Sequence, residues 1–105
     1  MGGRSVGGTR ELLVERKVRG GKLFRIRVHF ENDVASRVVL TGDFFLEPDE
    51  GIDELEKALL RAYSSPDRGS ATKVIEDASS GLAITGFSPC DLVGALEEAG
   101  GCRGA

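Results

Sequence analysis

The stretch "KLFRIRVHFE", residues 22–31, alternates strictly between apolar and polar side chains, and no other feature of the sequence restricts the possible folds as much. Neighbouring side chains of an extended strand point to opposite faces of a sheet. Such a strand belongs in an antiparallel sheet that is covered on one face and open to water on the other. The covered face would carry Phe24, Ile26, Val28 and Phe30, and the open face Leu23, Arg25, Arg27 and His29.

Candidate strands at residues 11–18 and 36–43 lie on either side of this stretch, with turn residues at Gly20-Gly21 and Asn32-Asp33. A three-residue connection is expected at each turn, the second over residues 32–34, because it sets apolar residues opposite one another. A two-residue turn at Gly20-Gly21 instead sets apolar residues opposite Lys17 and Glu15. The expected pairs are Val14 with Ile26, Leu12 with Val28, Glu15 with Arg25, Val28 with Val38, and Ile26 with Leu40.

The third strand runs into two adjacent phenylalanines, in the sequence "TGDFF" at residues 41–45. Phe44 is in phase with the apolar row of the strand and is expected in the core. Phe45 then falls on the open face and stays outside, provided that the strand remains extended. The alternative is that the chain curls under and both rings enter the core. The expected neighbours of Phe45 on the open face are Arg25, Arg27, His29, Arg37, Val39 and Thr41.

The second half of the chain reads as helical. A first helix follows Pro48, a second spans about residues 70–78, and an extended connector or short strand covers residues 81–87. The last helix has the clearest start, with Ser88 as N-cap, Pro89 at the first position and Asp91 at the third. The expected fold is therefore α+β, an antiparallel three-stranded meander followed by two to three helices packed on one face. The expected buried positions are Ile52, Leu55, Ala58, Leu59, Ala62, Val74, Ile75, Ala78, Leu92, Val93 and Leu96.

Length and charge restrict the class of protein. The 105 residues suffice for one domain, expected at residues 10–99 between disordered tails at 1–9 and 100–105. A net charge of −3 gives no basic field for nucleic acid. No apolar stretch reads as a signal peptide or a membrane span, and a cytoplasmic location is expected. Cys90 and Cys102 fit neither a zinc site nor a disulfide framework.

Few residues have the pattern of a catalytic site. His29 can contact a phosphate or carboxylate, and Cys90 stands at a helix start, but no catalytic set can be assembled around them. The carboxylates between residues 43 and 50 lack metal-ligand spacing, so no metal site is expected. Basic residues and glycine amides near the first turn are candidates for contact with an anion or nucleotide. These candidates are Gly20, Gly21, Lys22, Arg25 and Arg27.

An exposed aromatic ring beside several arginines is typical of a protein–protein interface. Phe45 and the arginines of the open face form such a group in the expected sheet. The residues therefore favour a binding or accessory module over an enzyme that works alone.

Two longer motifs add a family to this interpretation. "KVRGGKLFRIRVHFE" and "LTGDFFLEPDEGIDELEKALL", with the later "GFSPCDLVGAL", resemble the C-terminal accessory domain of lipoate–protein ligases over about residues 15–98. The glycines and lysine of the first turn, the GDFF loop and Glu47-Pro48 match the family pattern. Arg19 stands where the family usually has proline, and Cys90 where an acidic residue is common.

The resemblance implies an accessory subunit that pairs with a separate catalytic subunit. Such ligases activate lipoate with ATP to lipoyl-adenylate and then transfer the lipoyl group to a lysine of a lipoyl carrier domain. ATP, Mg²⁺ and lipoate would bind through the catalytic subunit, and this chain would hold no catalytic residue and no cofactor of its own. The residues implied as a lid over the adenylate site are Gly42, Asp43, Phe44, Phe45 and Glu47.

Two other classes have a similar layout of strands followed by helices. A sulfur-transfer or iron–sulfur scaffold protein needs reactive cysteines on loops, which Cys90 and Cys102 do not supply. A protein-binding domain without a ligase role stays open as a second alternative.

Overall fold

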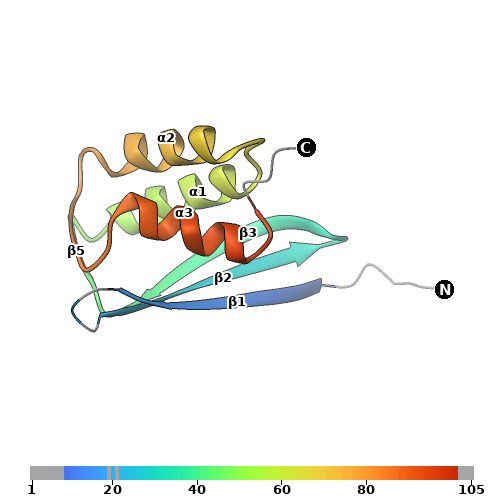
Figure 1. The fold of residues 1–105 in the computed structure, drawn as a ribbon, viewed down its shortest axis with the longest axis horizontal. Coiled ribbons are helices and arrows are strands. Elements are labelled where there is room, and N and C mark those ends of the chain that lie inside the picture. Colours follow the sequence, from blue (N-terminus) through green and yellow to red (C-terminus); the bar gives the residue numbers. More distant parts are fainter. Residues whose placement is uncertain (1–8, 19, 21, 102–105) are drawn as a thin grey trace.

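The structure is a computed structural model and describes residues 9–18, 20 and 22–101. It has the expected α+β fold, a three-stranded antiparallel sheet followed by three helices, together with a small second sheet (Figure 1). The elements are β1 (Thr9–Lys17), β2 (Leu23–Glu31), β3 (Val34–Gly42), β4 (Phe45–Glu47), α1 (Gly51–Tyr63), α2 (Arg68–Ser79), β5 (Ala83–Thr85) and α3 (Pro89–Glu98).

The first hairpin has the expected register. Val14 pairs with Ile26 and Glu15 with Arg25, so the alternative with a two-residue turn is wrong. The amide of Val18 donates to the Lys22 carbonyl at 2.8 Å, which leaves a three-residue connection with Gly20 at a φ of +92°. Arg19 and Gly21 lie outside the described residues.

The second hairpin reaches the expected register by a different route. Val28 pairs with Val38 and Ile26 with Leu40, as expected. The loop is nevertheless the two residues Asn32 and Asp33 alone, both at positive φ, and not the three residues 32–34. The register then shifts between His29 and Phe30, so a β-bulge takes up the extra residue.

The helices cover one face of the sheet, as expected. α1 packs on β3 and α3 packs on β1, while α2 packs on these two helices and lies farthest from the sheet (Figure 1). The apolar row of β2 is buried beneath this layer, with each side chain at most 4% exposed. The core includes Phe24, Ile26, Val28, Phe30, Val38, Leu40, Leu55, Leu59, Ile75, Leu92, Val93 and Leu96.

The helix boundaries differ in part from the expected ones. α1 begins at Gly51 and buries the expected Leu55, Ala58, Leu59 and Ala62, with Ile52 half-buried. α2 begins at Arg68 and not at residue 70, because the Asp67 carboxylate accepts a hydrogen bond from the Ser70 amide at 2.7 Å.

The start of α3 is confirmed. The Asp91 carboxylate accepts from the amide of the N-cap Ser88 at 2.8 Å. At the other end of this helix, Gly100 and Gly101, which were expected in a disordered tail, donate to carbonyls of α3. Similarly, Thr9 of the expected N-terminal tail already belongs to β1. The rest of both tails lies outside the described residues.

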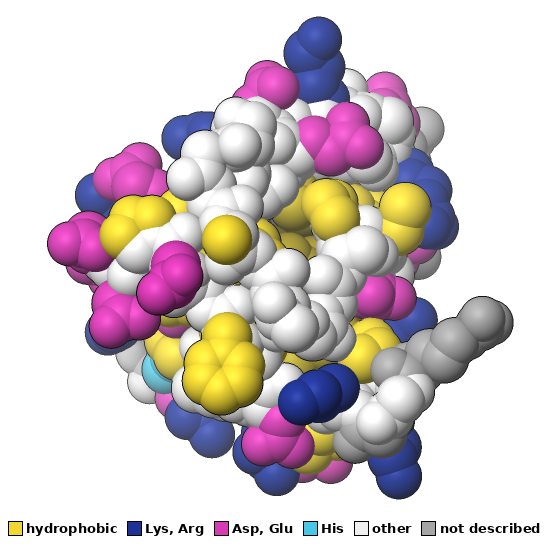
Figure 2. Space-filling model, turned by 90° about the vertical axis from the view of Figure 1, so that its left-hand side faces the viewer, with side chains coloured by type: hydrophobic (Ala, Val, Ile, Leu, Met, Phe, Trp, Pro, Cys, Tyr) yellow, Lys and Arg dark blue, Asp and Glu magenta, His cyan; other side chains and the backbone are white. Residues whose placement is uncertain are grey.

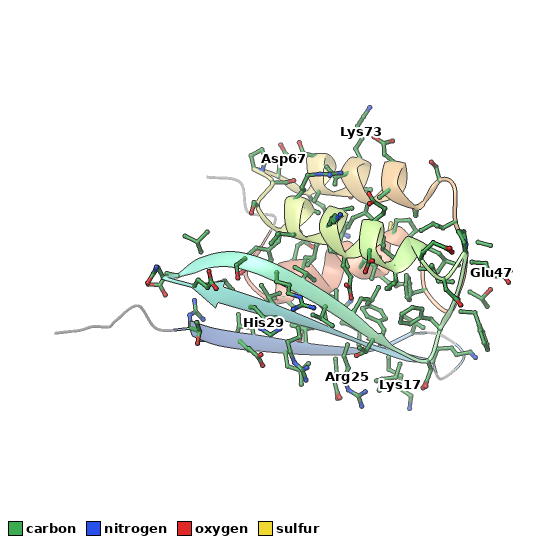
Figure 3. The ribbon with its side chains drawn as sticks, turned by 180° about the vertical axis from the view of Figure 1, so that it is seen from behind. Lys17, Arg25, His29, Glu47, Asp67 and Lys73 are labelled. Carbon is green, nitrogen blue, oxygen red and sulfur yellow. The ribbon has the colours of Figure 1, made fainter. Side chains whose placement is uncertain are left out.

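The open face of the sheet carries ion pairs across β1 and β2. Glu15 contacts Arg25, and Glu11 contacts both Arg27 at 3.6 Å and His29 at 3.0 Å. Figure 3 shows Arg25 on the side of the sheet away from the helices. Pairs as exposed as these contribute about 0.2–1 kcal/mol each, so the covered face determines the fold.

Asp67 gives a pH-dependent contribution to stability. Hydrogen bonds from the Ser70 amide and hydroxyl lower the pKa of Asp67 in the folded chain. Its stabilising effect is therefore complete above the ordinary aspartate pKa and is lost as pH falls through the lower pKa of the folded state.

We expect Asp67→Ala to lower Tm at neutral pH and the difference in Tm from wild type to shrink in acid, as measured in thermal melts by circular dichroism. Asp67→Asn, which keeps a neutral acceptor, is the control. A difference for Asp67→Ala that stays constant down to acid pH contradicts this account.

Candidate functional site

The chain leaves the main sheet at Gly42. This residue has a φ of +142°, and a Cβ there would lie 2.4 Å from the Leu23 carbonyl oxygen and 2.5 Å from the Phe24 Cα. The Asp43 amide donates to the same Leu23 carbonyl at 2.7 Å. Glycine is required here because the backbone both turns and passes close to β2. The strand therefore does not stay extended as far as the two phenylalanines.

Phe44 turns inward, as expected from its phase. Its ring packs edge-on against Phe87, with the centroids 4.9 Å apart. Phe87 in turn contacts the buried Phe24 at 5.3 Å. Phe44 is half-buried against the core, so the alternative in which both rings are buried is wrong.

Phe45 is exposed, as expected, but in a different setting. Its side chain is 73% exposed, the largest value among the exposed large apolar side chains of the described residues. It belongs to β4, which pairs with β5 in a separate two-stranded sheet, with Phe45 opposite Thr85. Because the chain bends at Gly42, the ring does not continue the open face beside Arg25 and Arg27. It lies instead beside the first hairpin turn.

An open depression of about 600 Å³ brings together most of the loop residues singled out from the sequence. The hairpin turn contributes two lining residues and the segment after β3 contributes four. Figure 2 shows this end of the molecule, with apolar side chains next to both basic and acidic ones. The lining residues are Gly20, Lys22, Gly42, Asp43, Phe44 and Phe45. Glu47 follows two residues later in β4, and Gly21 lies outside the described residues.

Both signs of charge occur near Phe45, and the acidic side chains outnumber the basic ones. Lys22 lies on the side of the hairpin turn and is exposed. On the other side the chain continues through exposed carboxylates into α1, beginning with Glu47, Asp49 and Glu50. The sequence from residue 43 to residue 56 contains no lysine or arginine. The exposed ring therefore lies at a depression that holds one lysine and one aspartate, Lys22 and Asp43, and an acidic segment follows it in the chain.

Arg25 and Arg27 do not line this depression. Both are engaged by glutamates of β1 on the open face. His29, which contacts Glu11, is on the same face, whereas α3 with Cys90 is on the covered face. The sheet separates His29 from Cys90, so these two residues form no pair.

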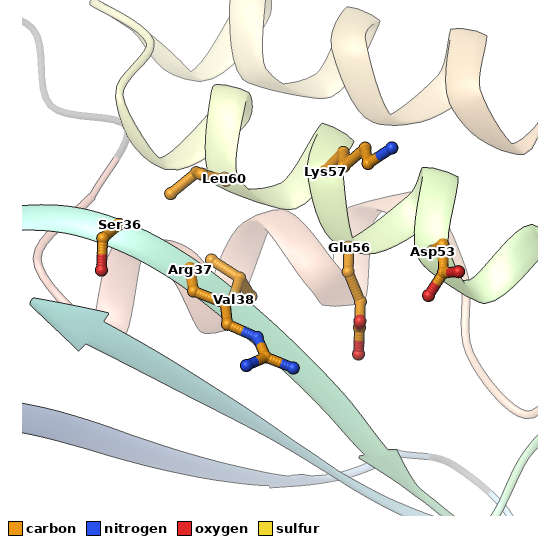
Figure 4. A pocket seen from close by; sticks show the side chains of 7 residues that line it. All are labelled: Ser36, Arg37, Val38, Asp53, Glu56, Lys57 and Leu60. Atoms are coloured by element: carbon orange, nitrogen blue, oxygen red, sulfur yellow. The ribbon is translucent and has the colours of Figure 1, made fainter.

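A second depression, of about 250 Å³, lies between the edge strand β3 and α1 (Figure 4). Glu56 extends from α1 toward β3, and its carboxylate accepts a hydrogen bond from the Leu40 amide at 2.7 Å. Glu56 thus occupies an edge position that a neighbouring strand would otherwise take. The lining residues are Ser36, Arg37, Val38, Asp53, Glu56, Lys57 and Leu60, and among them Arg37 was expected on the open face as part of a partner surface.

The described part of the chain holds neither a metal-binding cluster nor a membrane-spanning helix. Within residues 9–18, 20 and 22–101, no three histidine, cysteine or acidic side chains come together in a way that could hold a metal ion. No helix among the same residues has the length and apolar content needed to cross a bilayer.

Comparison with known proteins adds one structural match. No family model and no curated protein matches the sequence. A solved chain from the archaeal lipoylation system of Thermoplasma acidophilum, described as a bi-partite lipoate protein ligase and its E2 lipoyl domain, has a TM-score of 0.63 to this structure. The match covers 85% of this chain and 97% of that one at 22% sequence identity. The two chains share one fold. The resemblance drawn from the GDFF and hairpin motifs is thus confirmed at the level of the fold.

Sequence reasoning missed two residues at this site. Phe87 stacks on Phe44, and Gly86, at a φ of +128°, allows the loop to approach: a Cβ there would lie 2.9 Å from the Phe44 Cβ. The sequence "TGF" at residues 85–87 was assigned to an extended connector or short strand, and its last two residues began the family motif "GFSPCDLVGAL". A glycine followed by an aromatic residue in that connector indicated a close contact with another segment. It did not indicate that this segment would be the one that contains Phe44.

The close approach at Gly42 gives a direct test of this geometry. We expect Gly42→Ala to destabilise the protein by about 2–4 kcal/mol, because the added Cβ meets backbone atoms that cannot move away and φ is positive. Gly20→Ala is the matched control, since its φ is also positive but nothing lies within 4 Å of the added Cβ. Its cost should be about 1–2 kcal/mol. Urea unfolding of both variants measures the difference, and equal costs contradict the close packing of the loop on β2.

Proposed function

We propose that this chain is the accessory subunit of a two-part lipoate–protein ligase. It pairs with a catalytic subunit and enables that subunit to activate lipoate with ATP. The observation that carries the proposal is the shared fold with a chain of the Thermoplasma lipoylation system, together with an exposed Phe45 on the loop that bears the family motif. ATP, Mg²⁺ and lipoate bind to the catalytic subunit, and the lipoyl carrier domain meets that subunit in the second step.

The reaction that the pair would carry out has two steps. The lipoate carboxylate attacks the α-phosphorus of ATP, which forms lipoyl-adenylate and releases pyrophosphate. A lysine amine of the carrier domain then attacks the acyl carbon, which forms the amide and releases AMP. Lipoyl-adenylate is a mixed anhydride and hydrolyses readily, so the site must exclude water while it persists.

Phe45 is suited to exclude water. A ring that is 73% exposed on the isolated chain loses most of its contact with water when it enters an apolar recess of a partner. We therefore assign the segment from Gly42 to Glu47 to the closure of the adenylate site, with Phe45 as the inserted residue. The proposal places the chain in the cytoplasm, where ATP is present.

Lys22 is the basic residue of the depression. Lys22 and Phe45 line the same depression, so docking that inserts Phe45 into the partner brings a positive charge to the adenylate site. A cation near the phosphates of ATP stabilises the charge of the departing pyrophosphate.

The role of Phe45 can be tested by reconstitution. We expect Phe45→Ala to reduce lipoate-dependent pyrophosphate release with the catalytic subunit about 10- to 100-fold, because truncating a central aromatic anchor costs about 1.4–2.8 kcal/mol. The free energy of unfolding should change by less than about 0.5 kcal/mol, since the ring is exposed. Val34→Ala, at a side chain that is 66% exposed in the other hairpin, is the control and should be fully active. Undiminished release by Phe45→Ala rejects the lid.

The role of Lys22 has a separate readout. We expect Lys22→Ala to raise the apparent KM for ATP about 3- to 10-fold while binding of the catalytic subunit is kept, because one charge near the phosphates is lost. Lys73→Ala, at an exposed lysine of α2, is the matched control (Figure 3). Steady-state kinetics at several ATP concentrations measure the effect, and an unchanged KM removes Lys22 from the nucleotide site.

The alternatives have their own outcomes. A sulfur-transfer or iron–sulfur scaffold requires a reactive thiol, and the free Cys90 is exposed at the start of α3. Rapid labelling of Cys90 by iodoacetamide near neutral pH favours that class. Absence of any activation of lipoate in the reconstituted pair, with a normal fold, favours a binding domain without a ligase role.

A further inference from the structure

Three phenylalanine rings form a continuous stack between the core and the candidate loop. Phe24, 1% exposed, forms the inner end of the stack. Phe87 lies next, with its ring centroid 5.3 Å from that of Phe24 and an interplanar angle of 58°. Phe44 forms the outer end, 4.9 Å from Phe87 at 65°. Tilted arrangements at these separations are favourable contacts between aromatic rings.

The stack determines where Phe45 points. Phe44 directly precedes Phe45, the first residue of β4, and the structure turns the two rings to opposite sides, with Phe44 half-buried against the core and Phe45 exposed. A Phe44 ring held inward by Phe87 therefore directs Phe45 outward. The backbone of Phe45 is also held by its pairing with Thr85 in the small sheet of β4 and β5.

Gly86, which connects β5 to Phe87, has no room for a side chain. Gly86 lies between Thr85 and Phe87, at a φ of +128°. A Cβ on Gly86 would lie 2.9 Å from the Phe44 Cβ and 3.1 Å from the Asp43 carbonyl oxygen. The absence of a side chain at Gly86 thus lets the two segments pack against each other.

We propose that Phe87 is a positioning residue, which holds Phe44 so that Phe45 is presented as a preformed anchor. The matching feature on the partner is an apolar recess of the size of a phenyl ring. A preformed anchor avoids the entropic cost of ordering a loop during binding. The role of the anchor in the ligase rests on the proposed function, but the positioning itself is a property of the isolated chain.

The isolated chain can be tested first. The protein contains five phenylalanines, so fluorine-labelled phenylalanine gives five signals that single variants can assign. We expect Phe87→Leu to shift the Phe44 and Phe24 signals and to speed amide exchange in β4 and β5 at least about tenfold, while exchange in β1 to β3 is unchanged. Ile75→Val, a fully buried change in α2, is the control for general loosening of the core. Unchanged exchange in β4 and β5 overturns the proposal.

Two glycines of the same connector, Gly81 and Gly86, test the geometry without replacing any of the three phenylalanines. Gly86→Ala should displace Phe44 and reproduce the signal shift and the faster exchange. Gly81→Ala should do neither, because nothing lies within 4 Å of a Cβ at that position. Equal behaviour of the two variants contradicts the proposed packing.

The link to activity needs the reconstituted pair. Phe87→Leu should lower lipoate-dependent pyrophosphate release about tenfold at a fixed subsaturating concentration of this chain, with recovery at high concentration, and Phe87→Tyr should restore the activity. If Phe87→Leu loosens β4 and β5 but leaves the release unchanged, the role of the preformed anchor in the activity of the pair is overturned. If the wild-type pair shows no release, the proposed function fails, and the exchange measurement still decides whether Phe87 positions Phe45.

Discussion

Burial of the apolar row of β2 is the interaction on which the rest of the structure depends. β2 is the central strand, and its four core-facing side chains are each at most 4% exposed beneath α1 and α3. Removing such side chains from water contributes about 1.5–3 kcal/mol each, whereas the exposed ion pairs of the open face contribute much less. Helices must cover the face that carries this row, because its side chains would otherwise be exposed to water. The alternate residues of β2 point to the other face, which stays in water and can carry charge.

Phe24 extends this core to the candidate site. It is the first residue of the row, and its ring contacts Phe87 while it also belongs to the hydrophobic core. The backbone of Gly42, at the end of β3, also packs closely against Phe24. Phe24 therefore contacts both the end of β3 and the aromatic stack. The segment from Gly42 to Glu47 is therefore held on the packed domain, with the Phe45 ring exposed to a partner.

Local signals in the sequence predicted the strands, their register and the start of α3, since alternation and capping residues act over a few neighbouring positions. The β-bulge after His29 shows the limit of such reasoning, because a two-residue turn with a bulge and a three-residue turn give the same register farther along. The pairing of β4 with β5 and the contact between Phe44 and Phe87 join segments far apart in the chain, and no local pattern indicates them. The glutamate partners of Arg25 and Arg27 follow from the register, and both arginines form ion pairs on the open face. Their contact with a nucleotide stays a prediction.

The arrangement of charge around Phe45 bears on how a partner would be oriented. An apolar ring supplies most of the binding energy at the centre of an interface, but by itself it allows rotation about the axis of insertion. The charged groups around the ring are Lys22 and Asp43 in the depression, and Glu47, Asp49 and Glu50 in the segment that leads into α1. In the proposed complex, with Lys22 at the phosphates of ATP, cations of the catalytic subunit that face Glu47, Asp49 and Glu50 would favour this orientation over the reverse one. The ring and its charged surround thus have separate physical tasks, affinity for the first and direction of closure for the second.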